Sequence, residues 1–327
     1  MSVFRSIVLT IFFISTSTIS AQFTDVINSN RPGESMSAFS VGKTVIQAEA
    51  GLYGIDESHK YLNYDAKGFG AELSVRYGAF FEQLEFILDM QYQNDNYTTD
   101  LTEENRSGLK QFTLGAKFLV YDPNKNFERK PNLYSWKANH AFSWRELIPA
   151  VAVYGGFNVT IGNNPFISRF EEKLTPKGMI MTQNQFGKYV LVTNIIADKL
   201  MSNYMSFGYI VTLTRGFSPR WSGFIENQGI QSDHYTDGIF RGGAAYLLWQ
   251  NIQIDASIGK NIKDTPSTLI GGIGLSWRFD DDYEEVWNRA PDKEDSKDKE
   301  KDKKDKKAKK DKAKKRLDEV EGETKPE

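Results

Sequence analysis

The feature that most constrains the fold is a period-two alternation of apolar and polar side chains, repeated from Lys43 to Phe279 in runs separated by turn residues. In the clearest run, residues 84–93, large apolar side chains hold the even positions, and the odd positions other than Ile87 are polar. Successive side chains of a strand point to opposite faces, so each run predicts a strand with one apolar and one polar face. The runs match the ~10 residues with which a tilted strand crosses a bilayer.

A soluble β-sandwich also alternates, and two further features favour a membrane barrel. The polar faces carry Glu, Asp, Arg and Gln at mid-strand, in strands longer than the five or six residues usual in soluble proteins. Aromatic side chains gather beside short turns, as in an interfacial girdle; they include Tyr77, Phe80, Phe81, Trp221, Trp249, Trp277 and Phe279. The sequence therefore predicts an all-β fold: a transmembrane up-and-down antiparallel β-barrel over residues 43–279.

Counting back from Phe279 gives about twelve strands, an even number that places both termini in the periplasm. They are predicted near residues 42–55, 66–78, 83–94, 108–121, 146–159, 177–186, 188–198, 204–216, 219–230, 237–249, 251–263 and 267–279. The run at 177–186 alternates least, and without it the count would be odd. Residues 94–107, 160–176 and 231–237 are expected to be extracellular loops. Residues 122–145 are expected to be a long periplasmic connection, either packed across the rim or part of a partner surface.

The N-terminus predicts export. Residues 1–21 contain Arg5, the short apolar run Ile7–Ile14 and a small-residue stretch ending at Ala21, which is typical of a signal peptide. No other segment has the ~20 apolar residues of a spanning helix. The chain has no cysteine, so lipoprotein anchoring, disulfides and thiolate metal sites are excluded.

The C-terminus has a different composition. From Asp280 to Glu327, 34 of 48 residues are charged, 16 basic and 18 acidic, which predicts a disordered, Lys-rich periplasmic tail. Export argues against nucleic acid as its partner. Anionic lipid, cell-wall polymer or an acidic periplasmic protein are the partners that a Lys-rich arm fits.

Charged residues on the polar face are the candidate lumen or constriction residues: Glu49, Glu72, Arg76, Asp89, Glu226, Arg241 and Asp255. One interpretation is a pairing network that fills and stiffens the barrel, since a lone buried ion is costly. The other is a polar constriction or an ion-responsive binding site. Twelve strands lie between filled eight-stranded and open sixteen-stranded barrels. Residues 22–42, with Arg31-Pro32-Gly33, are therefore a candidate lumen plug.

Neither an enzyme nor a cofactor is expected. Asp233-His234 beside Ser232 is similar to the acid–base pairs of surface hydrolases, but no third orienting group accompanies it, so a solvated loop is the better interpretation. Three scattered histidines and no cysteine also predict no metal site.

The last predicted strand ends Leu275, Trp277, Phe279 on its apolar face. This pattern resembles the assembly signal that the barrel-assembly machinery reads by strand pairing.

Short motifs in order along the chain resemble one family. They are Arg31-Pro32-Gly33, Gln47-x-Glu49-x-Gly51-x-Tyr53, Arg76-Tyr77-Gly78, Leu114-Gly115-Ala116-Lys117, Phe224-Ile225-Glu226, Asn251-x-Gln253-x-Asp255 and Gly274-x-Ser276-x-Arg278-Phe279. The family comprises outer-membrane barrels of Gram-negative bacteria named for a role in phenol meta-pathway degradation, often labelled "transporter" in Bacteroidota. The resemblance implies a twelve-stranded barrel in outer-membrane lipid.

It also implies a transporter or channel for a small, hydrophobic or aromatic solute. The alternative is a non-enzymatic structural or accessory subunit of an outer-membrane complex, docked through residues 122–145 and the tail.

Overall fold

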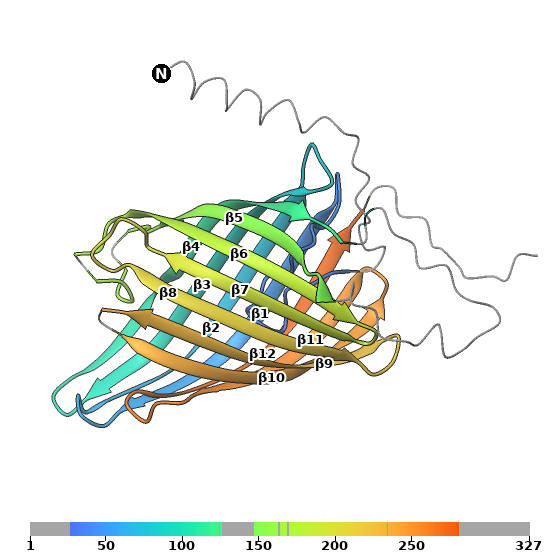
Figure 1. Ribbon diagram of the computed structural model, residues 1–327. Helices are drawn as coiled ribbons and strands as arrows, with labels where there is room; N and C mark the ends of the chain where they lie inside the picture. The colour runs from blue at the N-terminus through green and yellow to red at the C-terminus, as the bar shows by residue number, and fades with distance from the viewer. Residues whose placement is uncertain are drawn as a thin grey trace, which may run out of the picture. The chain divides into compact units, whose positions relative to one another are not determined.

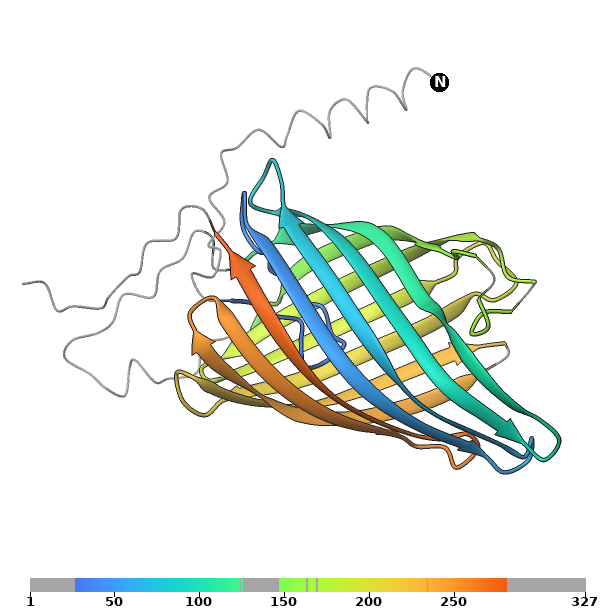
Figure 2. The ribbon, with the colours of Figure 1, turned by 180° about the vertical axis from the view of Figure 1, so that it is seen from behind.

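The fold is a closed barrel of twelve antiparallel strands. The computed structural model describes residues 27–123, 125, 147–162, 164–168, 170–233 and 235–280. Each strand pairs with its neighbours in sequence, and β1 pairs with β12 to close the ring (Figures 1 and 2). The all-β class, the up-and-down topology and the number of strands are as predicted. Over the residues described, no helix is long and apolar enough to span a bilayer.

The strands run over these residues: β1 Ile46–His59, β2 Tyr64–Gly78, β3 Leu84–Thr99, β4 Glu103–Tyr121, β5 Ala150–Val159, β6 Leu174–Phe186, β7 Tyr189–Asp198, β8 Ser206–Gly216, β9 Trp221–Ser232, β10 Thr236–Trp249, β11 Ile252–Asn261 and β12 Ser267–Phe279. The weakly alternating run at 177–186 is a full strand, β6, which keeps the count even. We call the end of the barrel where β1 begins and β12 ends proximal, and the opposite end distal.

The polarity of the wall is reversed relative to a soluble protein. On β1 the side chain of Leu52 points outward and is 60% exposed, whereas Glu49 points into the lumen and is 1% exposed. The same alternation runs round the ring, because successive side chains of every strand face opposite sides. Outward-facing aromatics at the proximal end include Trp221, Trp249, Trp277 and Phe279. An apolar outer wall around a polar interior is the pattern of a barrel that faces lipid.

The prediction of a long loop at 94–107 is wrong. β3 continues to Thr99 and β4 begins at Glu103, so only residues 100–102 join them. Both faces of this extension are polar, which removes the alternation from the sequence, but cross-strand contacts maintain the pairing. The Arg106 guanidinium binds the Asp95 carboxylate at 2.8 and 3.0 Å and lies over the Tyr97 ring at 4.3 Å.

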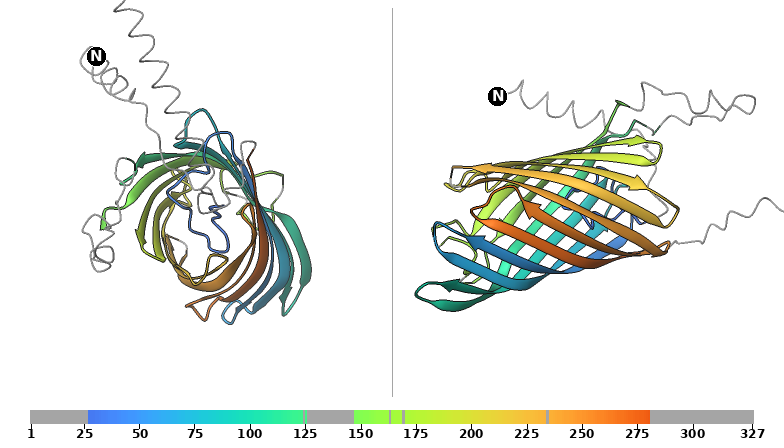
Figure 3. Two further views of the ribbon diagram at one scale, coloured as in Figure 1. Left: turned by 90° about the vertical axis from the view of Figure 1, so that its right-hand side faces the viewer. Right: turned by 90° about the horizontal axis from the view of Figure 1, so that it is seen from below.

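Residues 27–45, which we call the lumen segment, have no regular secondary structure, and most of them lie inside the barrel, whereas Lys43 and Thr44 are exposed. A view along the barrel shows this blue trace within the ring of strands (Figure 3, left). β1 begins only at Ile46, later than predicted, because Gly42 and Thr44 have positive φ angles and form a turn before the strand.

Other predictions fall outside the described residues. These are the signal peptide, residues 22–26, nearly all of the 122–145 connection, and the charged tail after Asp280. The accessory-subunit alternative depends on the last two, and it stays a prediction.

Candidate functional site in the barrel lumen

Three carboxylates of the wall accept backbone N–H groups of the lumen segment. Glu49 accepts from Asn30 and Arg31 at 3.2 Å, and Glu226 accepts from Glu34 at 3.0 Å and Ser35 at 3.3 Å. Glu85 accepts from Val41 at 3.0 Å. A buried backbone group without a partner costs about as much as a lost hydrogen bond. The wall carboxylates thus supply the acceptors that an irregular segment lacks.

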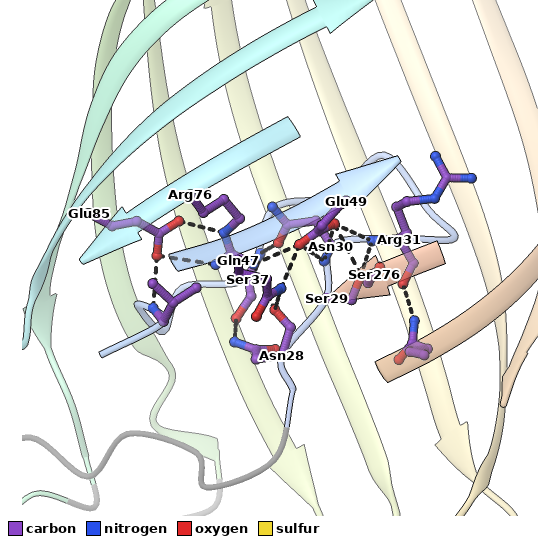
Figure 4. A network of polar contacts seen from close by, with 12 residues as sticks. Asn28, Ser29, Asn30, Arg31, Ser37, Gln47, Glu49, Arg76, Glu85 and Ser276 are labelled. Atoms are coloured by element: carbon purple, nitrogen blue, oxygen red, sulfur yellow. Dashed lines mark hydrogen bonds and ion pairs between the residues drawn. The ribbon is translucent and has the colours of Figure 1, made fainter. Parts of the chain in front are cut away.

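Two buried cations satisfy carbonyl groups of the same segment and bind the carboxylates. Arg76 donates to the Asn28 carbonyl at 2.7 Å and pairs with Glu85 at 2.6 Å and Glu49 at 3.2 Å (Figure 4). Lys117 donates to the Ser37 and Phe39 carbonyls at 3.1 and 3.0 Å and pairs with Glu85 at 3.1 Å. The charges are therefore paired, and their remaining bonding capacity holds the segment.

Arg31 occupies a seat at the closing seam of the barrel. Asp255, Gly274, Gly51 and Glu72 are consecutive cross-strand partners on β11, β12, β1 and β2. The Arg31 guanidinium binds the Glu72 carboxylate at one end of this row and the Asp255 carboxylate, at 3.2 Å, at the other. A Cβ on Gly51 or Gly274 would collide with the guanidinium. We call these four residues the arginine seat.

A second charged pair fixes the next turn of the lumen segment. Glu226 and Arg241 are direct cross-strand partners, and their side chains bind at 2.6 Å. Arg241 also reaches Glu34 of the segment at 3.3 Å. Thr212 donates its hydroxyl to Glu226 at 2.7 Å, so this carboxylate is bonded from the wall as well as from the segment.

Two cavities of the lumen lie against the lumen segment. The distal cavity, of about 360 Å³, is bordered by Asp89, Asp198 and Gln228 among others. The proximal cavity, of about 200 Å³, is bordered by Val190, Thr214 and Ser222 among others. Asn30, Arg31 and Gly33 border both cavities. These few residues are therefore the partition between the two.

Opposite the charged wall, the segment packs on apolar side chains. Met36 and Ala38 belong to a buried cluster with Ile87, Leu119, Ala150, Ala152, Tyr154, Met179 and Met181 on β3 to β6. Around the segment, the wall thus carries charged side chains on β9 to β12 and β1 to β4 and apolar side chains mainly on β5 and β6.

A family model described as "Putative MetA-pathway of phenol degradation" matches residues 29–279, most of the chain and the whole barrel. The chain belongs to this family. The match begins inside the lumen segment, so it covers most of this segment as well as the barrel.

Three solved structures are similar to this chain to different degrees. An outer-membrane channel from Pseudomonas putida F1 has a TM-score of 0.53 and 9% identity, with 77% of this chain and 100% of that chain covered. The translocator domain of the autotransporter NalP from Neisseria meningitidis has a TM-score of 0.43 and 9% identity, with 72% of this chain and 88% of that chain covered. The KdgM porin in complex with disordered oligogalacturonate has a TM-score of 0.42 and 7% identity, with 70% of this chain and 99% of that chain covered. At 9% identity, the likeness to the channel from Pseudomonas putida F1 concerns the fold alone. No curated protein sequence matches the chain significantly.

Six of the seven candidate lumen residues touch the lumen segment. Glu49, Arg76 and Glu226 bind its backbone, Glu72 and Asp255 bind Arg31, and Arg241 binds Glu34. Asp89 stands apart and borders the distal cavity. The residues of the predicted assembly signal, Leu275, Trp277 and Phe279, lie on the outer face of β12, where they are exposed.

Several residues of the site were not among the candidates. Glu85 and Lys117 lie on the same inward face but were not selected, although a charged side chain at an inward position is the criterion by which the other candidates were chosen. Gln183, which accepts bonds from the Ser37 hydroxyl and the Ala38 N–H, is an uncharged residue with no such signal. Gly51 and Gly274 gave one signal only, a glycine at an inward position on each of the two closing strands.

The hydrolase-like loop has an ordinary structural role where it is described. The Ser232 hydroxyl accepts the Tyr235 N–H and donates to the Tyr235 carbonyl, which closes a turn. His234 lies outside the described residues. Among the residues described, no group of three His, Cys, Asp or Glu side chains is placed to bind a metal ion.

Proposed function

We propose that the protein is an outer-membrane channel for a small solute, closed at rest by its own lumen segment, with both termini in the periplasm. The apolar outer wall, the polar lumen and the membership of a barrel family support this placement. The channel-like fold of the Pseudomonas putida protein is consistent with it. The family's description further suggests a hydrophobic or aromatic solute.

The observation that carries the proposal is the partition. Two cavities lie on either side of Asn30, Arg31 and Gly33, and the same three residues border both. Moving this short stretch joins the cavities without moving a strand. The gate is therefore residues 30–33 of the lumen segment, and the arginine seat is its latch.

The latch is suited to reversible movement. Hydrogen bonds to charged groups contribute about 1.5–3 kcal/mol each, so a few such bonds hold a segment without making it permanent. When Arg31 leaves, Glu72 and Asp255 remain in a lumen that water can enter, where their charges are hydrated rather than stranded. The rest of the segment keeps its bonds to Lys117 and Glu85 and its apolar packing.

A cross-link tests the gate directly. The Ser29 and Ser276 hydroxyl oxygens lie 2.7 Å apart, one on the segment and one on β12, and the chain has no cysteine of its own. Cysteine side chains at these two positions would place their sulfur atoms close enough to form a disulfide, whose S–S bond is about 2.05 Å long. The double variant Ser29→Cys/Ser276→Cys is inserted into planar bilayers, oxidised and then reduced. The wild-type protein, which reductant cannot alter, and each single variant are the controls.

We expect the oxidised double variant to show few or no openings and the reduced form to regain the wild-type conductance. Gel migration before and after reduction confirms that the cross-link formed. Equal conductance of the cross-linked and reduced forms would exclude the lumen segment as a gate. Wild-type protein without conductance, and without solute-dependent swelling of liposomes, would contradict the channel itself.

A further inference from the structure

The distal part of β4 is paired on one side only. β3 pairs with β4 as far as Thr98 with Glu103, whereas β5 pairs with it only from Thr113, which lies opposite Asn158. Residues 103–112 therefore form an edge of the sheet, in a hairpin that projects at the distal end (Figure 2). A sheet edge presents unpaired N–H and C=O groups, to which another extended chain can bind.

The bonding at the hairpin turn shows which backbone groups are open. The Thr99 N–H donates to the Thr102 carbonyl at 2.8 Å, so the backbone groups of Thr102 face β3. In an antiparallel strand the N–H and C=O groups of alternate residues face the same side. Those of the next even-numbered residues therefore also face β3, and those of Glu103, Asn105 and Ser107 face the open side. No other segment of the described chain bonds to these open groups.

The open stretch ends where a loop covers the edge. The Asn164 side chain donates to the Leu109 carbonyl at 2.5 Å, and a Cβ on Gly108 would lie 3.2 Å from Pro165. Because Asn164 follows β5, the Leu109 carbonyl faces away from β3, which agrees with the alternation inferred from the turn. The free part of the edge is therefore residues 103–107, which we call the β4 edge.

The side chains of the β4 edge favour a cationic partner. Glu103 and Glu104 are exposed, and neither side chain has an ion pair or a hydrogen bond within the part of the chain that the structure describes. The cation of the stretch, Arg106, is bonded to Asp95 at 2.8 and 3.0 Å. Cross-strand pairs of opposite charge stabilise a sheet, so an added strand gains from cations opposite the two glutamates.

A second copy of this chain fits the β4 edge less well. Two copies in one membrane have β4 running the same way, from the distal tip toward the bilayer, so their edges cannot pair antiparallel. Their glutamates at positions 103 and 104 would also meet, and like charges directly opposite one another are destabilising. A separate peptide can run antiparallel to β4 and can carry the complementary charge.

We propose that the β4 edge binds an extended, cationic peptide segment of another protein, which adds to the sheet as a further strand antiparallel to β4. The backbones of Glu103, Asn105 and Ser107 each offer one donor and one acceptor to it. Two adjacent Lys or Arg residues of the peptide lie opposite Glu104 and Glu103. The site is on the barrel wall rather than in the lumen, and it depends on the proposed function only for the side of the membrane from which the peptide arrives.

Two labelled peptides test the charge preference: Thr-Val-Thr-Val-Thr-Lys-Lys and the same sequence ending in Glu-Glu, both with blocked termini. Binding to the folded full-length protein in detergent micelles is measured by fluorescence anisotropy, with empty micelles subtracted. We expect the Lys-Lys peptide to bind about tenfold more tightly, because two attractive cross-strand pairs replace two repulsive ones.

Asn105→Pro tests the backbone contact. Proline removes the N–H group that faces the open side at the middle of the edge and leaves the bonds to β3 in place, as is usual for proline on an edge strand. We expect about tenfold weaker binding of the Lys-Lys peptide, because one peptide carbonyl loses its donor. Asn105→Ala keeps the N–H group and is the matched control, with an expected change of about twofold or less.

Heat-modifiable gel migration shows that each variant is folded. Equal binding of the two peptides, or equal binding of the Lys-Lys peptide by Asn105→Pro and Asn105→Ala, would overturn the proposal. The charged tail after Asp280 is the same in both variants, so binding to the tail cannot produce a difference between them. Because the measurement needs no conductance, this experiment and the cross-linking experiment can each fail while the other succeeds.

Discussion

At the residue scale, two glycines decide where the gate closes. Gly51 and Gly274 leave the only gap in the row between Glu72 and Asp255 through which a guanidinium can lie flat on the wall. Neither glycine has a positive φ, so their role here is space rather than backbone freedom. The two carboxylates attract the Arg31 guanidinium, and the two glycines leave space for it because they have no side chain.

Gly274→Ala should therefore unlatch the gate. The new methyl group occupies the position of the guanidinium, so we expect a higher open probability in planar bilayers, similar to that of Arg31→Ala. Gly271→Ala on the same strand is the control, since its Cβ would meet nothing closer than the Ser257 carbonyl at 4.0 Å. Wild-type gating in Gly274→Ala, with a folded barrel on gels, would show that the seat does not hold the gate.

Residue pattern alone predicts which charges face the lumen but not what they bind. Glu49, Glu226 and Asp255 face inward because of the two-residue period, which is local. Their partners depend on register and on the path of the lumen segment, which are not local. Asp255 was predicted only as an inward-facing charge, and it binds Arg31, more than 200 residues earlier in the chain.

At the element scale, β3 and β4 show where prediction from alternation stops. Alternation exists only where one face meets lipid and the other meets the lumen. Beyond the apolar band both faces are polar, and the strands continue through contacts such as Arg106 with Asp95 and Asn105 with Asn96. The ends of β3 and β4 are therefore strands, although their sequence pattern is typical of a loop.

Shortening this hairpin should therefore leave the barrel intact. Tyr97 and Glu104 are cross-strand partners, so Asn-Gly in place of Thr98–Glu103 gives a two-residue turn on a matching register. We expect the free energy of unfolding, from urea titration in lipid vesicles, to change by about 1 kcal/mol or less, because the lost contacts are exposed. Loss of the heat-modifiable folded band would mean that the extension is needed for assembly.

At the scale of the whole molecule, an even strand count puts both ends of the barrel chain on the proximal side. If that side is periplasmic, the distal hairpins face the medium. A cysteine-free chain allows a simple check with a membrane-impermeant maleimide. Leu101→Cys, at the tip of the β3–β4 hairpin, should be labelled in intact cells. Arg220→Cys, in the proximal β8–β9 turn, should be labelled only after the outer membrane is permeabilised. The reverse pattern would invert the proposed orientation.

The arginine seat also has a consequence for biogenesis. Its halves come from opposite ends of the chain, Glu72 and Gly51 from the first two strands and Gly274 and Asp255 from the last two. Before β1 meets β12 the seat does not exist, and Arg31 has nothing to bind between them. In the proposed channel, closing the wall and shutting the pore are thus one event, so a newly inserted barrel would be sealed as soon as β1 pairs with β12.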